Sequence, residues 1–100
     1  MPVTLLDLYC LNALCDDYEN VASIQAGVRW ATHGNINITE EEVKEGLIRL
    51  YKEGLVEVYD YDPLQTAFLL SEIAGDWNRK WFFIAAAGRK ELDQNESKLG

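Results

Sequence analysis

Few residues in this sequence could carry nucleophilic, acid–base or metal chemistry. The one histidine is His33, and the two cysteines are Cys10 and Cys15. Nucleophilic catalysis needs an imidazole or a matched pair of carboxylates, and we expect His33 at the end of a helix, where it favours the negative end of the helix dipole. A single histidine and two cysteines on different helix faces cannot supply the three or four convergent ligands that zinc prefers. We therefore predict no metal site and no cofactor.

The two cysteines are predicted to remain thiols. Cys10 and Cys15 lie in one predicted helix, where about 100 degrees of rotation per residue turns them about 140 degrees away from each other. As small apolar side chains in a core, they fit a reducing compartment.

The acidic residues also have an ordinary explanation. The adjacent acids at 16–17 and 40–42 lie at predicted helix boundaries, where carboxylates cap helices or stay solvated. Neither GxGxxG nor GxxxxGK[ST] occurs, so the pattern of a phosphate-binding loop is absent. We predict that the protein is not an enzyme.

Length and composition indicate one acidic globular domain. The chain has 100 residues, of which 48% are hydrophobic and 11% aromatic, and its net charge is -8. This composition can form a core, but the charge has the wrong sign for a protein held to phosphates by Coulomb attraction alone. Uncharged stretches such as 20–28 and 63–71 are too short to span a membrane. The start of the chain lacks the pattern of a signal peptide, and we expect a cytoplasmic protein.

The first half of the chain predicts two helices. Thr4 can cap a helix over residues 5–15, in which apolar residues recur at helical spacing. Asn20 can cap a second helix over 21–33, and Gly34 suits the left-handed position that ends a helix.

A third helix has the strongest local signal. Thr39 and Glu42 form a capping box, and three glutamates lie at the positive end of the helix dipole. The helix is expected over 40–53 and ends before Gly54. Its predicted buried face consists of Val43, Leu47, Leu50 and Tyr51.

Alternating residues predict strands. Residues 35–38 alternate polar with β-branched side chains and predict a short strand. Residues 55–61 and 80–85 alternate and are rich in β-branched and aromatic types, so we expect them to pair. Residues 86–92 are expected to form a last helical turn or two. The domain is then 1–92, with 93–100 as a flexible polar tail.

The long insert between these strands is apolar, and its sequence fits two different structures. Residues 63–75 could form a short helix capped by Asp62, with Pro63 at its first position, or an extended segment. The segment either folds back onto the domain itself or packs on a second copy of the chain or another protein.

This order of elements resembles a winged helix-turn-helix domain over residues 4–92. Residues 50–57 resemble the family's passage from recognition helix to wing, and 81–89 are similar to the second wing strand of MarR-like and PadR-like regulators. Ala85 stands where that group tends to have threonine. The resemblance implies an α+β, mainly α fold: a three-helix core, a short first strand, and a two-stranded wing with a long apolar insert.

The resemblance also implies that the helix over 40–53 would enter a DNA major groove. The core direction leaves three acids against two bases among its outward positions. These positions are Glu41, Glu42, Glu45, Ile48, Arg49 and Lys52. Such a face repels phosphate more than it attracts it, since groove-reading helices carry basic and amide side chains.

We therefore predict a non-catalytic regulatory module that acts through protein contacts, as a homodimer or an adaptor. Its predicted docking surface comprises Glu41, Glu45, Ile48, Arg49, Lys52, Leu64, Phe68 and Leu69. The alternative is a DNA-binding transcriptional regulator, because a dimer can concentrate a few cations into one patch. The residues assigned to that alternative are Arg29, Lys44, Arg49, Lys52, Arg79 and Lys80.

Overall fold

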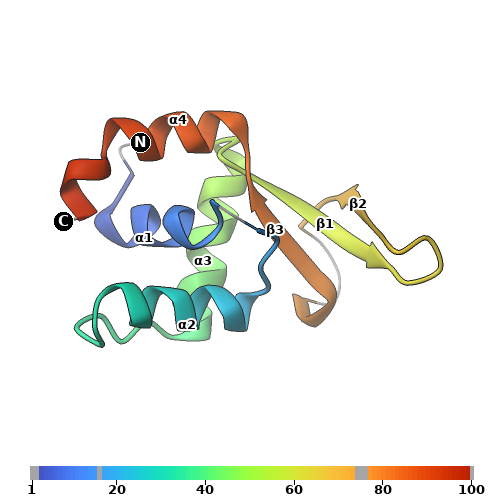
Figure 1. The fold of residues 1–100 in the computed structure, drawn as a ribbon, viewed down its shortest axis with the longest axis horizontal. Helices are drawn as coiled ribbons and strands as arrows, with labels where there is room; N and C mark the ends of the chain where they lie inside the picture. The colour runs from blue at the N-terminus through green and yellow to red at the C-terminus, as the bar shows by residue number, and fades with distance from the viewer. Residues whose placement is uncertain (1–2, 16, 74–76, 100) are drawn as a thin grey trace.

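The computed structural model describes residues 3–15, 17–73 and 77–99, and Figure 1 shows a cluster of helices from which a twisted sheet extends. The α-helices are α1 (Leu5–Ala13), α2 (Val21–Ala31), α3 (Glu40–Lys52) and α4 (Ala86–Gln94). The strands are β1 (Val56–Asp62), β2 (Ala67–Ser71) and β3 (Lys80–Ile84). Short 3-10 helices cover Trp77–Arg79 and Glu96–Leu99. The predicted α+β class is confirmed.

The first three helices begin where their capping residues predict. The Thr4 hydroxyl accepts from the Asp7 N–H at 3.0 Å, and the Asp7 carboxylate accepts from the Thr4 N–H at 3.2 Å. Thr39 and Glu42 form the same reciprocal pair at the start of α3. The Asn20 side chain accepts a backbone N–H of the first turn of α2 at 2.8 Å. Each cap satisfies N–H groups that have no partner within the helix.

The second helix is shorter than expected. It ends at Ala31 rather than at residue 33, because His33 and Gly34 have φ angles of 53° and 78°. Two successive left-handed residues cannot continue a right-handed helix. Gly54, with φ of 74°, follows α3 in the same way and turns the chain into β1.

The sheet is antiparallel with strand order β2-β1-β3. The predicted pairing of 55–61 with 80–85 is confirmed, with Val56 opposite Ile84. The insert forms β2 on the other edge of β1, so within its described part it is a strand and the helical alternative is wrong. Asp62 caps no helix: its carboxylate accepts the Leu64 N–H at 2.9 Å in a tight turn. Residues 74 and 75 of the insert, like Asp16 in the first acidic pair, lie outside the described residues.

The predicted strand at 35–38 is wrong. This segment runs between α2 and α3 with no strand beside it in the described chain, and the Ile38 carbonyl accepts from the Gln25 side-chain amide at 3.0 Å. Its alternation instead buries Ile38, which is 1% exposed. The N-terminal half reaches the sheet elsewhere: Glu19 and Phe82 exchange backbone hydrogen bonds of 2.9 and 2.8 Å along the outer edge of β3.

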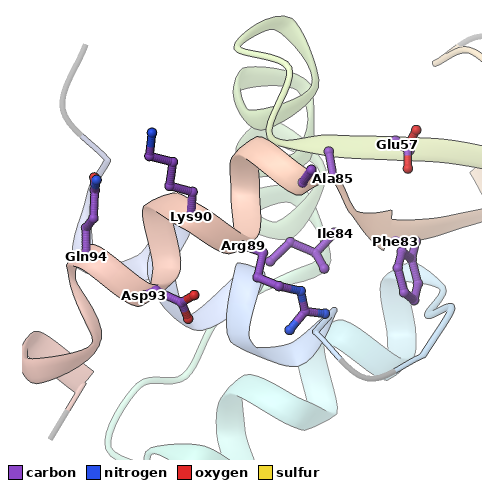
Figure 2. Close-up of a pocket in the computed structure, with 9 residues that line it drawn as sticks. Glu57, Phe83, Ile84, Ala85, Arg89, Lys90, Asp93 and Gln94 are labelled. Carbon is purple, nitrogen blue, oxygen red and sulfur yellow. The ribbon is translucent and has the colours of Figure 1, made fainter.

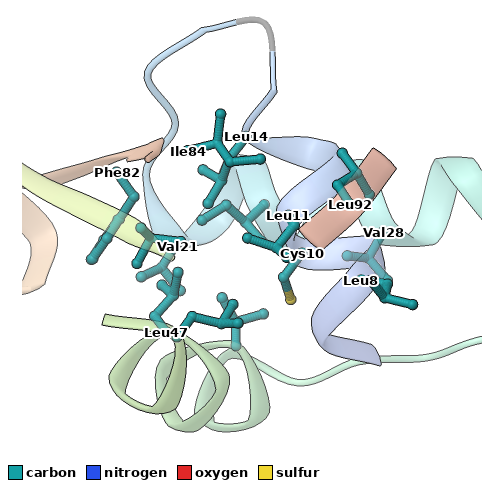
Figure 3. Close-up of a cluster of buried hydrophobic side chains, with 14 of the residues drawn as sticks. Leu8, Cys10, Leu11, Leu14, Val21, Val28, Leu47, Phe82, Ile84 and Leu92 are labelled. Carbon is teal, nitrogen blue, oxygen red and sulfur yellow. The ribbon is translucent and has the colours of Figure 1, made fainter. Parts of the chain in front are cut away.

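One core joins the helices to the sheet. Figure 3 shows side chains of α1, α2, α3, β3 and α4 converging on Leu11. The core members with no more than 1% exposure include Leu8, Leu11, Leu14, Ile24, Val28, Val43, Leu47, Val58 and Phe82. Burial of these side chains is the main favourable contribution to folding, at roughly 1.5–3 kcal/mol for each.

The C-terminal helix covers α1 in Figure 1 and is longer than the predicted turn or two. Leu92 is 7% exposed. The 3-10 helix after α4 brings Leu99 against the core, and the Tyr9 hydroxyl donates to the Leu99 carbonyl at 3.4 Å. The division into a domain of 1–92 and a flexible tail of 93–100 stays a prediction.

Gly88 provides a test of how closely α4 packs. A Cβ atom there would lie 2.0 Å from the Leu55 carbonyl oxygen, which already accepts the Ala85 N–H at 3.0 Å. We expect Gly88→Ala to lower the free energy of unfolding by about 2–3 kcal/mol, because backbone must move to admit the methyl group. Urea denaturation measures the change.

Gly46→Ala is the matched control. Its Cβ would meet Asp7 Oδ1 at 3.5 Å, which is ordinary contact, and alanine favours a helix by up to about 1 kcal/mol over glycine. Gly88→Ala as stable as this control would contradict the close packing of α4 on the turn before β1.

Candidate functional site

The outer face of α3 is predominantly acidic. Glu41, Glu45 and Lys52 are exposed along it, and Ile48 is half-buried. The Glu41 side chain is 80% exposed, and the Lys44 ammonium lies 3.9 Å from its carboxylate. The three glutamates of the first turn favour the helix through its dipole, so their charge stabilises α3 while it repels polyanions.

Arg49 turns from this face toward α1. Its guanidinium donates to the Asp7 carboxylate at 2.9 Å, and the Asp7 side chain is only 7% exposed. Gly46, one turn earlier, has no side chain to separate the two helices. Arg49 therefore neutralises a buried acid of its own chain, and its capacity to attract an external anion is reduced.

Lys80 is buried, contrary to its prediction as a surface cation. It is 8% exposed, and its ammonium donates to Asp60 at 2.9 Å and to the Ser71 hydroxyl at 3.1 Å. Ser71 donates to the second oxygen of Asp60 at 2.8 Å. The hydrogen bonds from Lys80 and then Ser71 lower the pKa of Asp60 below its ordinary value. This network joins all three strands and leaves Lys80 unavailable to DNA.

The other predicted cations lie on separate elements. Arg29 is exposed in the last turn of α2, and Arg79 is exposed just before β3. The Lys44 ammonium, besides its contact with Glu41, lies 5.9 Å from the centre of the Trp77 ring. Of the six cations assigned to DNA, Lys44, Arg49 and Lys80 are thus engaged within the chain.

Aromatic rings cover the sheet face that points away from the core. Tyr18, from the loop between α1 and α2, stacks on Phe68 with centroids 3.9 Å apart and planes inclined by 5°. Its centroid also lies 5.0 Å from those of Tyr59 and Phe83. Trp81 lies edge-on to Phe68 at 5.6 Å. Phe68, predicted as a docking residue, is therefore half-buried by contacts within the chain, and Tyr18 fastens β2 to the helical part.

The most exposed apolar side chains of the insert are its leucines. Leu64 is 95% exposed, Leu70 70% and Leu69 42%. Sequence analysis assigned Leu64 and Leu69 to the docking surface but missed Leu70. The alternation of β2 was the available signal, because Leu70 lies two positions from Phe68 and shares its face. Trp30, 84% exposed on α2, was also missed, although it falls outside the apolar stripe of that helix.

The thiol and histidine provide no reactive centre. Cys10 and Cys15 both remain thiols, as predicted. Cys10 is 1% exposed, and its burial, followed by the charge of Asp7, raises the pKa of its thiol to about 12. A thiol with this pKa stays protonated near neutrality and is a poor nucleophile. His33 lies exposed after α2. Within residues 3–15, 17–73 and 77–99, no group of three histidine, cysteine or acidic side chains could hold a metal ion.

A shallow groove of about 730 Å³ lies between α4 and the end of β3 (Figure 2). Phe83 and Ala85 provide apolar walls, and Arg89, Lys90 and Asp93 provide charges of both signs. The Arg89 guanidinium donates to the Cys15 carbonyl. In Figure 2 the Lys90 side chain points away from that of Arg89. The groove has the mixed character of a contact surface and lacks a nucleophile paired with a base.

Comparison with solved structures identifies a relative in fold. The fold is similar to that of a transcriptional regulator. This regulator comes from Clostridium thermocellum; its TM-score is 0.70 at 19% sequence identity, over 93% of this chain and 78% of that chain. No protein-family description and no curated protein matches the sequence. None of the helices in the described part of the chain is long and apolar enough to cross a membrane.

The Asp60 network predicts a pH-dependent stability. The folded-state pKa of Asp60 is lowered. Its contribution to the free energy of unfolding is therefore fully present above the unfolded pKa of about 4 and is lost as pH falls through the folded pKa. We expect Asp60→Asn to lower the free energy of unfolding by about 1 kcal/mol at pH 7. The change is small because half of the Asp60 side chain faces solvent. Urea denaturation at a series of pH values should show that the free energies of unfolding of Asp60→Asn and wild type converge as the pH is lowered from neutral to acid.

Asp93→Asn removes the same charge from an exposed position of α4 and is the control. We expect it to leave stability unchanged at neutral pH. A loss as large as that of Asp60→Asn, or a difference at Asp60 that grows in acid, would show that the network with Lys80 does not stabilise the fold.

Proposed function

We propose that this chain is a non-catalytic winged-helix regulatory module that acts through protein contacts. Three helices followed by an antiparallel hairpin and an inserted strand agree with a winged helix, and the likeness to a transcriptional regulator favours a regulatory role. The docking surface consists of the outer face of α3, with Glu41, Glu45, Ile48, Arg49 and Lys52, and the apolar insert, with Leu64, Phe68 and Leu69.

The carrying observation is the charge around α3. Glu41 and Glu45 stay exposed, whereas Arg49 is held by Asp7 and Lys80 by Asp60. A protein bound to DNA through phosphates gains affinity by neutralising them with lysine and arginine, and this face has few such groups to offer. An acidic helix face and exposed leucines in one chain are better suited to a protein surface that carries apolar and basic residues.

A DNA-binding transcriptional regulator is the second candidate. The likeness in fold to a transcriptional regulator favours it, and Arg29, Arg49, Lys52 and Arg79 remain exposed. Two copies of the chain could bring these cations together against one duplex. The measurements below separate the two candidates.

Photo-crosslinking tests the protein-contact role directly. A photoreactive amino acid replaces Ile48 on α3, and a second variant carries it at Ser97, exposed after α4, as the matched control. In cells that express the full chain, we expect a discrete adduct of higher mass from position 48 only. Equal adducts at both positions, or none from position 48, would contradict a docking role for α3.

DNA titration with charge reversal tests the electrostatic argument. We expect wild-type protein to leave mixed duplex DNA unshifted at low salt. Glu41→Lys combined with Glu45→Lys should create binding that weakens steeply as salt rises, because phosphate contacts release counterions. The control, Asp93→Lys with Glu96→Lys, makes the same change in net charge on the C-terminal segment and should not bind.

Either of two results would overturn this account. Salt-sensitive binding by the wild-type protein would favour the DNA-binding regulator. Equal binding by both double variants would show that total charge, rather than the face of α3, governs the interaction with DNA.

A further inference from the structure

The two edges of the sheet differ. Along β3, Glu19 exchanges two backbone hydrogen bonds with Phe82 and covers the middle of that edge. At the other edge, β2 pairs with β1 alone among the residues that the structure describes. The outward N–H and C=O groups of β2 are therefore available to another strand, and an edge of this kind is a template for pairing with a second chain.

The β2 strand lacks the features that usually protect an edge. Its sequence, Ala67-Phe68-Leu69-Leu70-Ser71, has no charge and no proline, although natural edges are commonly blunted by lysine, proline or a bulge. Leu70 and Leu69 are 70% and 42% exposed. The outer face of the strand is fixed by the ring of Phe68, which stacks on Tyr18 with centroids 3.9 Å apart. The open edge of β2 is therefore preformed.

We infer that β2 pairs antiparallel with β2 of a second copy of this chain, about a two-fold axis that passes between the two copies of Leu69. This deepens the proposed function and rests on it, since it names the homodimer among its protein contacts. A two-fold axis perpendicular to the sheet must place one residue opposite its own equivalent, because directly opposite residues point to the same face. The axis at Leu69 is the one that pairs the whole strand, Ala67 with Ser71 and Phe68 with Leu70.

Charges along this register agree with self-pairing. Glu72, the acid nearest to β2, lies opposite Thr66 of the second copy, so no two acids face each other across the new pair. On the outer face, each Phe68 ring meets Leu70 of the other copy, an aromatic–aliphatic pair that favours antiparallel strands. On the opposite face, Leu69 meets its own equivalent. The pairing covers the two most exposed side chains of the strand.

The association is expected to be weak and sensitive to salt. A five-residue strand gives a small interface, below the roughly 1,200 Å² that stable complexes usually bury. Each chain also carries a net charge of -8, and this repulsion between copies is screened by salt. We expect a monomer–dimer equilibrium that shifts toward dimer as protein concentration or salt rises, whereas a dimer held by ion pairs would shift the other way.

A charge swap at the axis tests the register. In the pairing, residue 69 of one copy lies directly opposite residue 69 of the other, so Leu69→Lys alone and Leu69→Glu alone place like charges together. Sedimentation equilibrium should show each variant as a monomer under conditions where wild type dimerises, and an equimolar mixture should recover a heterodimer. Ser97→Lys adds the same charge at an exposed position after α4 and should dimerise like wild type.

A second measurement guards against misfolding, because Leu69 lies opposite Asp60 within the chain. Thermal unfolding of each variant checks the fold. Leu69→Cys should also oxidise to a covalent dimer faster than Ser97→Cys, which lies exposed after α4, since two opposed strand residues bring their Cβ atoms to about 4.5–5.5 Å. Both variants retain Cys10 and Cys15, so these two thiols contribute equally.

The outcomes separate this inference from the proposed function. A monomeric wild type at every concentration and salt, a mixture that fails to associate, or equal oxidation rates at positions 69 and 97 would each overturn pairing through β2. The adduct from position 48 on α3 would be unaffected by these results. Loss of that adduct with the charge-swap behaviour intact would instead remove the docking role of α3 and leave the dimer.

Discussion

Two acidic side chains, Asp7 and Asp60, hold the basic groups that reach them from distant parts of the chain. Arg49 contacts Asp7 across 42 positions, and Lys80 contacts Asp60 across 20. The first pair joins α1 to α3, and the second joins β3 to β1 with Ser71 of β2 between them. A charge buried without a partner is costly, so both ion pairs stabilise the folded state. The second pair also takes Lys80 away from the surface, and the first engages the guanidinium of the partly exposed Arg49.

The helix starts and the central strand pair could be predicted because their signals are local. Thr4, Asn20 and Thr39 each mark a cap within three residues of the N–H that they accept. Alternation over β1 and β3 identifies two half-buried strands. The backbone pairing of Glu19 with Phe82 has no such signal, because a single bridge in a loop leaves no periodic pattern. Residues 35–38 show the converse: their alternation is real, but burial under neighbouring helices satisfies it without a sheet.

The candidate surface was predicted in composition better than in detail. The acidic face of α3 follows from helical periodicity, whereas the position of Arg49 depends on Asp7, which lies in another helix. Lys80 begins a strand, and its burial depends on Asp60 and on a serine of β2. Phe68 is apolar in any case, but only the stacking of Tyr18, from the first loop, decides that its ring is half-buried on the outer face of the sheet. Contacts between elements distant in sequence decide all three cases.

The bridge between Glu19 and Phe82 determines how far any assembly through the sheet can grow. It engages the backbone N–H and C=O of Phe82, at the middle of the β3 edge, with the protein's own backbone, which hinders another strand from pairing along that edge. Filaments grow when sheets pair edge to edge in a head-to-tail manner, and such growth needs both edges of every sheet. With β3 closed in this way, joining through β2 is self-limiting and ends at a closed pair. An apolar, uncharged strand can thus be tolerated at the surface of this small protein without seeding a fibre.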